Sequence, residues 1–308
     1  MNAHIIKSQK ADIQSASDVE IVDGIAYLVG DDSPYLYCLD HDWNLLRRLP
    51  LFASAHGGDR IPKEEKPDLE AMSVVYADDT PHLLIFGSGS RSPQRDLCFW
   101  VDLAAGVAGA LPVRRASLTS LYDRLRHDPL VVGSGKLNIE GAAATREHLI
   151  LFQRGNISHK NVALYYDLPA FMAYVRDNTT KPPEPTIYAY GLPSLQGVLS
   201  GFSGATLVPG SDQIIFAAAV EDTTTELEDG PTLGSFLGML SVEDGRTRRQ
   251  DPTQPKKVAL VRDVNGATYT GKIESVAVLG REGAGEFTLL AATDDDLGGS
   301  ELLLIKVE

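Results

Sequence analysis

Residues 138–156 read NIEGAAATREHLILFQRGN, and this stretch decides the fold. It holds a first short apolar segment, NIEGAAAT (138–145), a polar turn, and a second apolar segment, LILF (149–152). The polar residues QRGN (153–156) follow. Two short apolar segments separated by a turn predict an antiparallel β-hairpin.

Similar hairpins recur along the whole chain. The further copies are DLEAMSVV (68–75) with LLIF (83–86), GFSGATL (201–207) with IIF (214–216), KIESVAV (272–278) with FTLL (287–290), and a weaker copy, SASD (15–18) with IAYL (25–28). A β-unit that repeats every ~50–70 residues is typical of a β-propeller.

More apolar segments follow each hairpin and complete the predicted blades. A third strand is predicted at residues 34–39, 96–103, 162–168, 235–242 and 301–307, and a fourth at 44–49, 107–113, 186–190 and 257–262. The last copy has no fourth strand of its own. We therefore expect the N-terminal residues 4–8 to pair with the last blade and close the ring, which removes an exposed sheet edge.

The pattern predicts an all-β protein, one β-propeller domain over residues 1–308, with four-stranded antiparallel blades. Five blades account for the chain, and six remain an alternative if residues 104–134 and 169–200 hold a degenerate blade. Helical spacing near residues 116–128 and 169–178 predicts helical insertions there instead. The 28 glycines and 17 prolines fit a chain with many turns.

Charged residues occupy equivalent places in the copies. In a propeller the first strand of each blade lines the channel, so its start and the end of the second strand share one mouth. The first strands begin near Glu70, Glu140 and Glu274, with Ser17 (or Ser15) and Ser203 at the matching places of the other two copies. The residues near the ends of second strands are Arg91, Arg154, Asn156, Glu221 and Asp294.

Three glutamates around one axis repel each other. At ~6 Å and an effective dielectric constant of ~20, each pair costs ~3 kcal/mol. A bound cation, protonation or the nearby arginines can offset this repulsion. Oxygen ligands suit Ca²⁺ or Mg²⁺, so we expect a metal site of Glu70, Glu140, Glu274 and Ser203. The structural alternative is that these glutamates hydrogen-bond the backbone of a neighbouring blade.

The repeated Ile/Leu-Glu-Gly/Ala/Ser pattern, with Arg91 and Arg154 after second strands, resembles bacterial propeller proteins of unknown function. More distantly it resembles the phytase-like esterase propellers and the calcium-dependent apyrase propellers. The apyrase resemblance implies a five-bladed ring with a central Ca²⁺ held by carboxylate and serine-type oxygens, and hydrolysis of nucleoside phosphates nearby. It also implies that Arg91 and Arg154 bind anions. The chain shows no extended apyrase signature beyond these positions.

Three functional hypotheses follow. In the first, a metal-dependent hydrolase acts on phosphoesters or related small anions, with Asp294 or Glu221 taking a proton and with Arg91, Arg154 and Asn156 binding the substrate. In the second, the propeller binds a ligand or protein without catalysis, and any ion is structural. In the third, the propeller is a structural module of a larger assembly.

Charge limits the partners. The 308 residues carry a formal net charge of −14, which disfavours nucleic acid and anionic membranes and favours cations. The N-terminus has no apolar stretch of signal-peptide length. We expect a monomeric cytoplasmic protein that acts on a small anionic molecule, or a secreted one if a signal peptide was removed.

Overall fold

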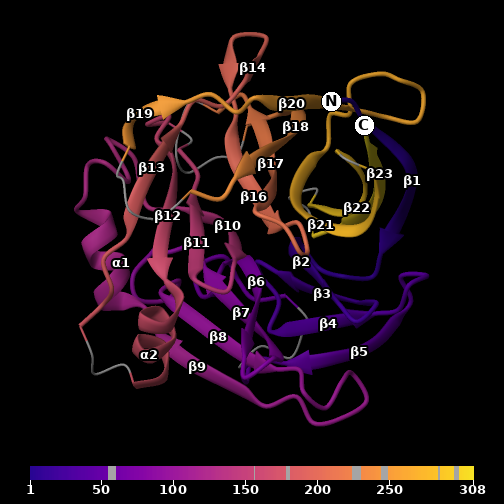
Figure 1. The fold of residues 1–308 in the computed structure, drawn as a ribbon. Helices are drawn as coiled ribbons and strands as arrows, with labels where there is room; N and C mark the ends of the chain where they lie inside the picture. Colours follow the sequence, from indigo (N-terminus) through magenta and orange to yellow (C-terminus); the bar gives the residue numbers. More distant parts are fainter. Residues whose placement is uncertain are drawn as a thin grey trace.

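The computed structural model is an all-β structure with two short helices, and its sheets are arranged around a common centre (Figure 1). It describes residues 1–54, 60–155, 157–177, 181–223, 230–243, 249–283, 285–294 and 298–308. None of the helices in these ranges is long and apolar enough to cross a membrane.

The first three units are antiparallel sheets whose strands follow chain order. Their strands are β2 (Ala16–Val22), β3 (Ile25–Gly30), β4 (Tyr35–Leu39) and β5 (Leu45–Pro50); β6 (Leu69–Ala77), β7 (Thr80–Gly87), β8 (Leu97–Asp102) and β9 (Val113–Ser117); and β10 (Ile139–Ala144), β11 (His148–Gln153), β12 (Asn161–Asp167) and β13 (Thr186–Tyr190). The third sheet gains a parallel fifth strand, β19 (Arg249–Thr253), which the repeat does not predict.

The last two units are joined in one eight-stranded sheet. Their strands are β16 (Gly201–Leu207), β17 (Gln213–Glu221), β18 (Thr232–Ser241) and β20 (Lys257–Arg262), then β21 (Lys272–Gly283), β22 (Glu286–Asp294) and β23 (Ser300–Val307), with β1 (Ala3–Ala11) between β23 and β20. The predicted pairing of the N-terminal segment with the last unit is confirmed, because β1 runs antiparallel to β23. Its additional parallel pairing with β20 is what merges the two units.

One predicted strand is wrong. Residues 107–112 form no strand, since the chain turns here: Gly106 donates its N–H to Leu103 at 2.9 Å and Gly109 donates to Gly106 at 3.0 Å. Gly106 also has a positive φ of 64°, which favours glycine and breaks a strand. The fourth strand of this sheet is β9, which begins at Val113.

The helices lie within the two segments where the sequence predicts helical insertions. They are α1 (Thr119–Arg126) and α2 (Leu168–Asp177). Both bury one face, α1 through Leu121, Tyr122 and Leu125. A small hairpin of β14 (Ser194–Leu195) and β15 (Val198–Leu199) leads into β16.

The first strand of each unit contributes to an inner ring. β2 contacts β6, β6 contacts β10, β10 contacts β16, β16 contacts β21, and β21 contacts β2 (Figure 1). Small residues permit this close approach: a Cβ on Gly204 would lie 2.5 Å from the Glu274 carbonyl oxygen. The Gly and Ala residues of the repeat are therefore a packing requirement of the ring.

Polar side chains connect neighbouring units of the ring. The backbone N–H of Ala16 on β2 donates to Ser300 Oγ at 2.8 Å, and the Asp18 carboxylate accepts the N–H of Met72 on β6. Glu20 on β2 instead accepts the hydroxyl of Thr206 on β16 at 3.4 Å. Because β2 and β16 are not neighbours in the ring, this bond spans the central axis.

Glu20 should make the stability of the fold depend on pH. Burial raises the pKa of this carboxyl from 4.5 to about 8. Between these values the folded chain keeps a proton that the unfolded chain releases, so the stabilisation is complete below pH 4.5 and is lost as pH rises through about 8. The loss is on the order of 4 kcal/mol, at about 1.4 kcal/mol per pKa unit.

We predict that Glu20→Gln removes most of this loss, because the amide accepts the Thr206 hydroxyl without ionising. Urea unfolding of both proteins at pH 5 and pH 9 measures the difference. The same change in unfolding free energy with pH in both proteins contradicts the assignment.

Candidate functional site

One residue in each inner strand is a β-bulge. In all five pairings of a first strand with its second strand, the register shifts past one residue near the start of the first strand. These residues are Ser17, Glu70, Glu140, Ser203 and Glu274; farther along β21 the register shifts twice more, past Leu279 and Glu282. A bulge re-aims the side chain that it carries, so this position controls what each unit presents at one end of the ring.

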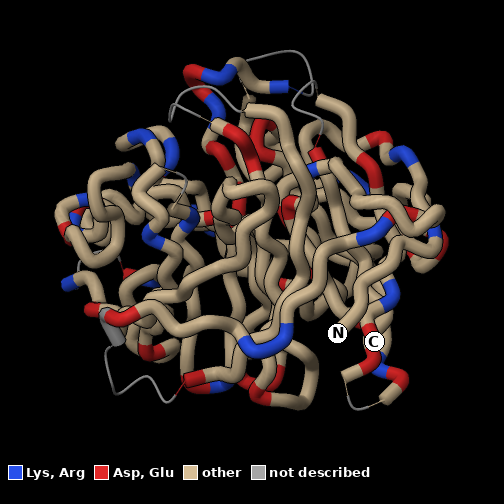
Figure 2. Tube along the Cα trace, turned by 90° about the horizontal axis from the view of Figure 1, so that it is seen from above, with Lys and Arg blue, Asp and Glu red and all other residues tan. Residues whose placement is uncertain are grey.

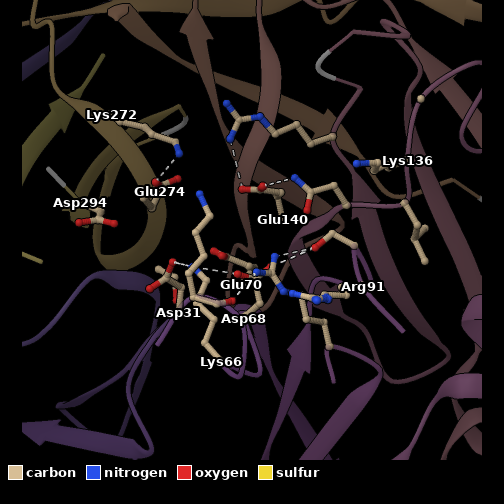
Figure 3. Close-up of a pocket in the computed structure, with 18 of the residues that line it drawn as sticks. Asp31, Lys66, Asp68, Glu70, Arg91, Lys136, Glu140, Lys272, Glu274 and Asp294 are labelled. Atoms are coloured by element: carbon tan, nitrogen blue, oxygen red, sulfur yellow. Dashed lines mark hydrogen bonds and ion pairs between the residues drawn. The ribbon is translucent and has the colours of Figure 1, made fainter. Parts of the chain in front are cut away.

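At this end of the ring lies a cavity of about 470 Å³, here called the hub pocket. Glu70, Glu140 and Glu274 all line it, so the predicted convergence of these three residues is observed (Figure 3). The other carboxylates of its wall are Asp31, Glu64, Asp68 and Asp294. The acidic cluster of the sequence analysis is therefore present.

Basic side chains alternate with these carboxylates in the wall. Lys66, Arg95, Arg154 and Lys272 are largely buried, whereas Lys63, Arg91 and Lys136 are more exposed. We call the three exposed cations the rim. Figure 2 likewise shows acidic and basic residues interspersed along the chain.

A chain of ion pairs connects the third, fourth and fifth units. Arg154 lies between Glu140, at 3.4 Å, and Glu221, and Lys272 lies 3.2 Å from Glu221 and 2.9 Å from Glu274. Burial raises the pKa of Glu221, but Arg154 and Lys272 outweigh it and hold that pKa below its ordinary value. Three buried carboxylates therefore share two cations.

A second cluster connects the first two units. Lys66 Nζ contacts Asp31 and lies 2.9 Å from Asp68, and Arg95 donates to Asp68 at 2.6 Å (Figure 3). Ser88 also donates to Asp68. Burial alone would raise the pKa of Asp68, but Lys66 and Arg95 hold it below its ordinary value.

Glu70 differs from its neighbours. It forms no hydrogen bond or ion pair with any residue in the described part of the chain. Its nearest carboxylate oxygens and those of Asp31 and Asp68 all lie within 4.8 Å of one another. Burial, followed by the Asp68 and Glu140 carboxylates, raises the pKa of Glu70 well above its ordinary value. The pKa values of Glu70 and Asp68 are therefore shifted in opposite directions.

Two expected site residues have other roles. Ser203 is buried and donates its hydroxyl to the Ile273 carbonyl at 2.6 Å, so it joins β16 to β21 and does not line the pocket. Ser17 likewise donates to the Leu69 carbonyl. Glu221 lies outside the pocket wall and pairs with Arg154 and Lys272; its expected role as a proton acceptor stays a prediction.

The residues that were expected to bind an anion lie in different environments. Arg154 lines the pocket, is only 3% exposed and pairs with Glu140 and Glu221; its expected role as a substrate ligand stays a prediction. Arg91 is half exposed and pairs with the exposed Glu64 at the rim. Asp294 lines the pocket. Asn156 lies outside the described residues.

The sequence analysis missed the lysines that neutralise the wall, Lys66 and Lys272. A signal was present for Lys272, since it stands two residues before Glu274, as Asn138 stands two before Glu140. Asn138 Nδ2 donates to Glu140 at 2.5 Å, and Lys272 contacts Glu274 in the same way. In these two strands, the side chain two residues before the bulge contacts the side chain of the bulge residue.

Together these features define an all-β protein of propeller-like fold with a charged pocket at its hub. The chain belongs to a family described as a family of unknown function (DUF6929), whose profile matches residues 12–307. No curated protein matches the sequence.

Several solved structures are similar at low identity. Glutaminyl cyclase of Myxococcus xanthus has a TM-score of 0.49 and 10% identity, covering 99% of this chain and 97% of its own. An α-L-arabinanase of Cellvibrio cellulosa has a TM-score of 0.48 and 11% identity, covering 96% and 91%. An exo-1,5-α-L-arabinanase from a bovine ruminal metagenomic library has a TM-score of 0.48 and 9% identity, covering 96% and 93%.

We predict that Arg154→Met destabilises the protein by about 3–5 kcal/mol, because it leaves Glu140 and Glu221 buried with one cation fewer. Adding Glu221→Gln to this variant should restore a large part of the loss. Arg91→Met is the matched control and should cost less than about 1 kcal/mol, since its ion pair is exposed. Urea unfolding measures all three, and equal losses for the two single variants contradict the prediction.

Proposed function

We propose that the chain is a five-bladed propeller hydrolase that binds a small anionic substrate, such as a phosphoester, in the hub pocket. Five equivalent bulges and the closed succession of five inner strands support the blade number. The observation that carries the function is the contrast between Glu70 and Asp68. Neighbouring carboxyl groups whose environments push their pKa values apart are characteristic of acid–base catalysis.

Glu70 is the proton donor in this proposal. Its raised pKa favours the protonated carboxyl group, and the side chain makes no hydrogen bond or ion pair with a described residue. When water attacks the phosphorus, the bond to the leaving oxygen breaks and Glu70 gives its proton to that oxygen. Asp294, on the same pocket wall, accepts the proton of the attacking water.

The rim supplies the binding site for the anion. Arg91 is paired with Glu64, but both side chains are at least half exposed. An exposed ion pair contributes only about 0–1 kcal/mol, so a phosphate group can replace Glu64 on the guanidinium. Lys63 and Lys136 add positive charge at the same edge.

We predict that Glu70→Gln lowers kcat by about 10²–10⁴-fold, because glutamine has no proton to donate. The wild-type rate should also fall as pH rises through the raised pKa of Glu70. Turnover of a panel of phosphoesters and nucleotides measures both effects. Glu147→Gln, on the exposed turn between β10 and β11, is the matched control. Unchanged turnover in Glu70→Gln, or no turnover of any compound by the wild type, contradicts the proposal.

A divalent cation is a second candidate for the same pocket. The proximity of Asp31, Asp68 and Glu70, with oxygens within 4.8 Å of one another, favours it, and such oxygens suit Ca²⁺ or Mg²⁺. A bound cation would supply Lewis-acid chemistry. Lys66 Nζ already contacts two of the three carboxylates, so an ion must displace this ammonium group.

We predict that Lys66→Met raises the affinity for Ca²⁺ at least tenfold, because the competing charge is gone. Melting temperatures in Ca²⁺, Mg²⁺ and EDTA, together with elemental analysis, measure binding. Adding Asp68→Asn should abolish the shift. If neither the wild type nor Lys66→Met responds to either ion, the pocket is not a cation site.

A further inference from the structure

The wall of the hub pocket contains a carboxylate oxygen that the protein leaves unsatisfied. Glu274 is only 5% exposed, and its Oε1 lies 2.9 Å from Lys272 Nζ. Its Oε2 is buried and has no hydrogen-bond partner among the residues that the structure describes. A buried oxygen without a partner is costly, so this atom is suited to accept a hydrogen bond from a bound molecule.

The charges around Glu274 indicate which kind of donor fits. Glu140, Glu221 and Glu274 share Arg154 and Lys272, which leaves one negative charge without a cation. Burial raises the pKa of Glu274 well above its ordinary value even though Lys272 is close. A cationic group entering the pocket would supply the missing charge and the missing hydrogen bond together.

The positive rim lies on the other side of the pocket. In Figure 3, Glu274 and Lys272 are on one side, and Arg91 and Lys136 are on the opposite side, with Glu70 and Glu140 between them. A cavity of about 470 Å³ holds a small organic molecule. Its two sides therefore complement a molecule with opposite charges at its two ends.

From this arrangement we propose that the ligand of the hub pocket is a small zwitterion. Its primary ammonium group donates to Glu274 Oε2, and its phosphate or carboxylate group binds Arg91 and Lys136. This inference rests on the proposed function and narrows its substrate from any small anion to one that also carries an amino group. Glu274 is then a specificity-determining residue, distinct from the proton donor Glu70.

Matched compounds that differ only in the amino group test this inference. The pairs are 2-aminoethyl phosphate with ethyl phosphate, and 4-aminobutanoate with butanoate. Calorimetric titration of the full chain should show at least tenfold tighter binding for the amino member of each pair. Glu274→Gln should remove this preference, because the amide keeps the shape of the side chain and loses its charge.

Two controls protect the test against misfolding. The melting temperature and circular dichroism of Glu274→Gln establish that it is folded, and Glu147→Gln, on the exposed turn between β10 and β11 and outside the pocket wall, should keep the preference.

The outcomes separate this inference from the proposed function. If ethyl phosphate is hydrolysed as fast as 2-aminoethyl phosphate in a Glu70-dependent reaction that Glu274→Gln does not affect, the zwitterion is wrong and the hydrolase stands. If the amino compounds bind through Glu274 but no phosphoester is turned over, the zwitterion stands and the hydrolase is wrong. Equal affinity within each pair also overturns the inference.

Discussion

In each inner strand one residue has no counterpart on the neighbouring strand, and the hub of the molecule depends on this displacement. A regular ladder would alternate side chains between the two faces of a sheet. The bulge interrupts the alternation at one place, and Glu70, Glu140 and Glu274 enter the pocket from three different units as a result. The small residue that follows, such as Gly141 or Gly204, lets the next inner strand approach closely.

The bulges bring carboxylates of like charge close together, and basic side chains in the pocket wall offset their repulsion. Three cations each contact carboxylates of two different units: Lys66, Arg154 and Lys272. These contacts make electrostatic balance a property of the assembled ring and not of any single sheet. The carboxyl groups of Glu70 and Glu274 are not fully balanced by cations. Glu70 is the proposed proton donor, and Glu274 is the proposed ligand of the ammonium group.

The sequence predicts the parts of this arrangement that are local or repeated. Alternating apolar segments locate nearly all strands, and the missing last strand explains why β1 pairs with β23. Equivalent positions in the copies predict that Glu70, Glu140 and Glu274 meet. The bond of Ser203 to Ile273 could not be predicted, because it joins residues 70 positions apart across a unit boundary. The parallel strand β19 depends on a similar long-range contact, with β13. The apolar residues after Gly106 suggest a strand, but the turn at Gly106 delays the start of that strand to Val113.

The five bulge positions differ in side chain while sharing one backbone geometry. Ser17 and Ser203 each donate to a carbonyl of the following inner strand, and Ser17 lines the cavity together with the three glutamates. Exchange between these residue types changes the charge of the cavity and leaves strand registers in place. A family built on this ring can therefore diverge in ligand preference by single substitutions, one unit at a time, without rebuilding its scaffold.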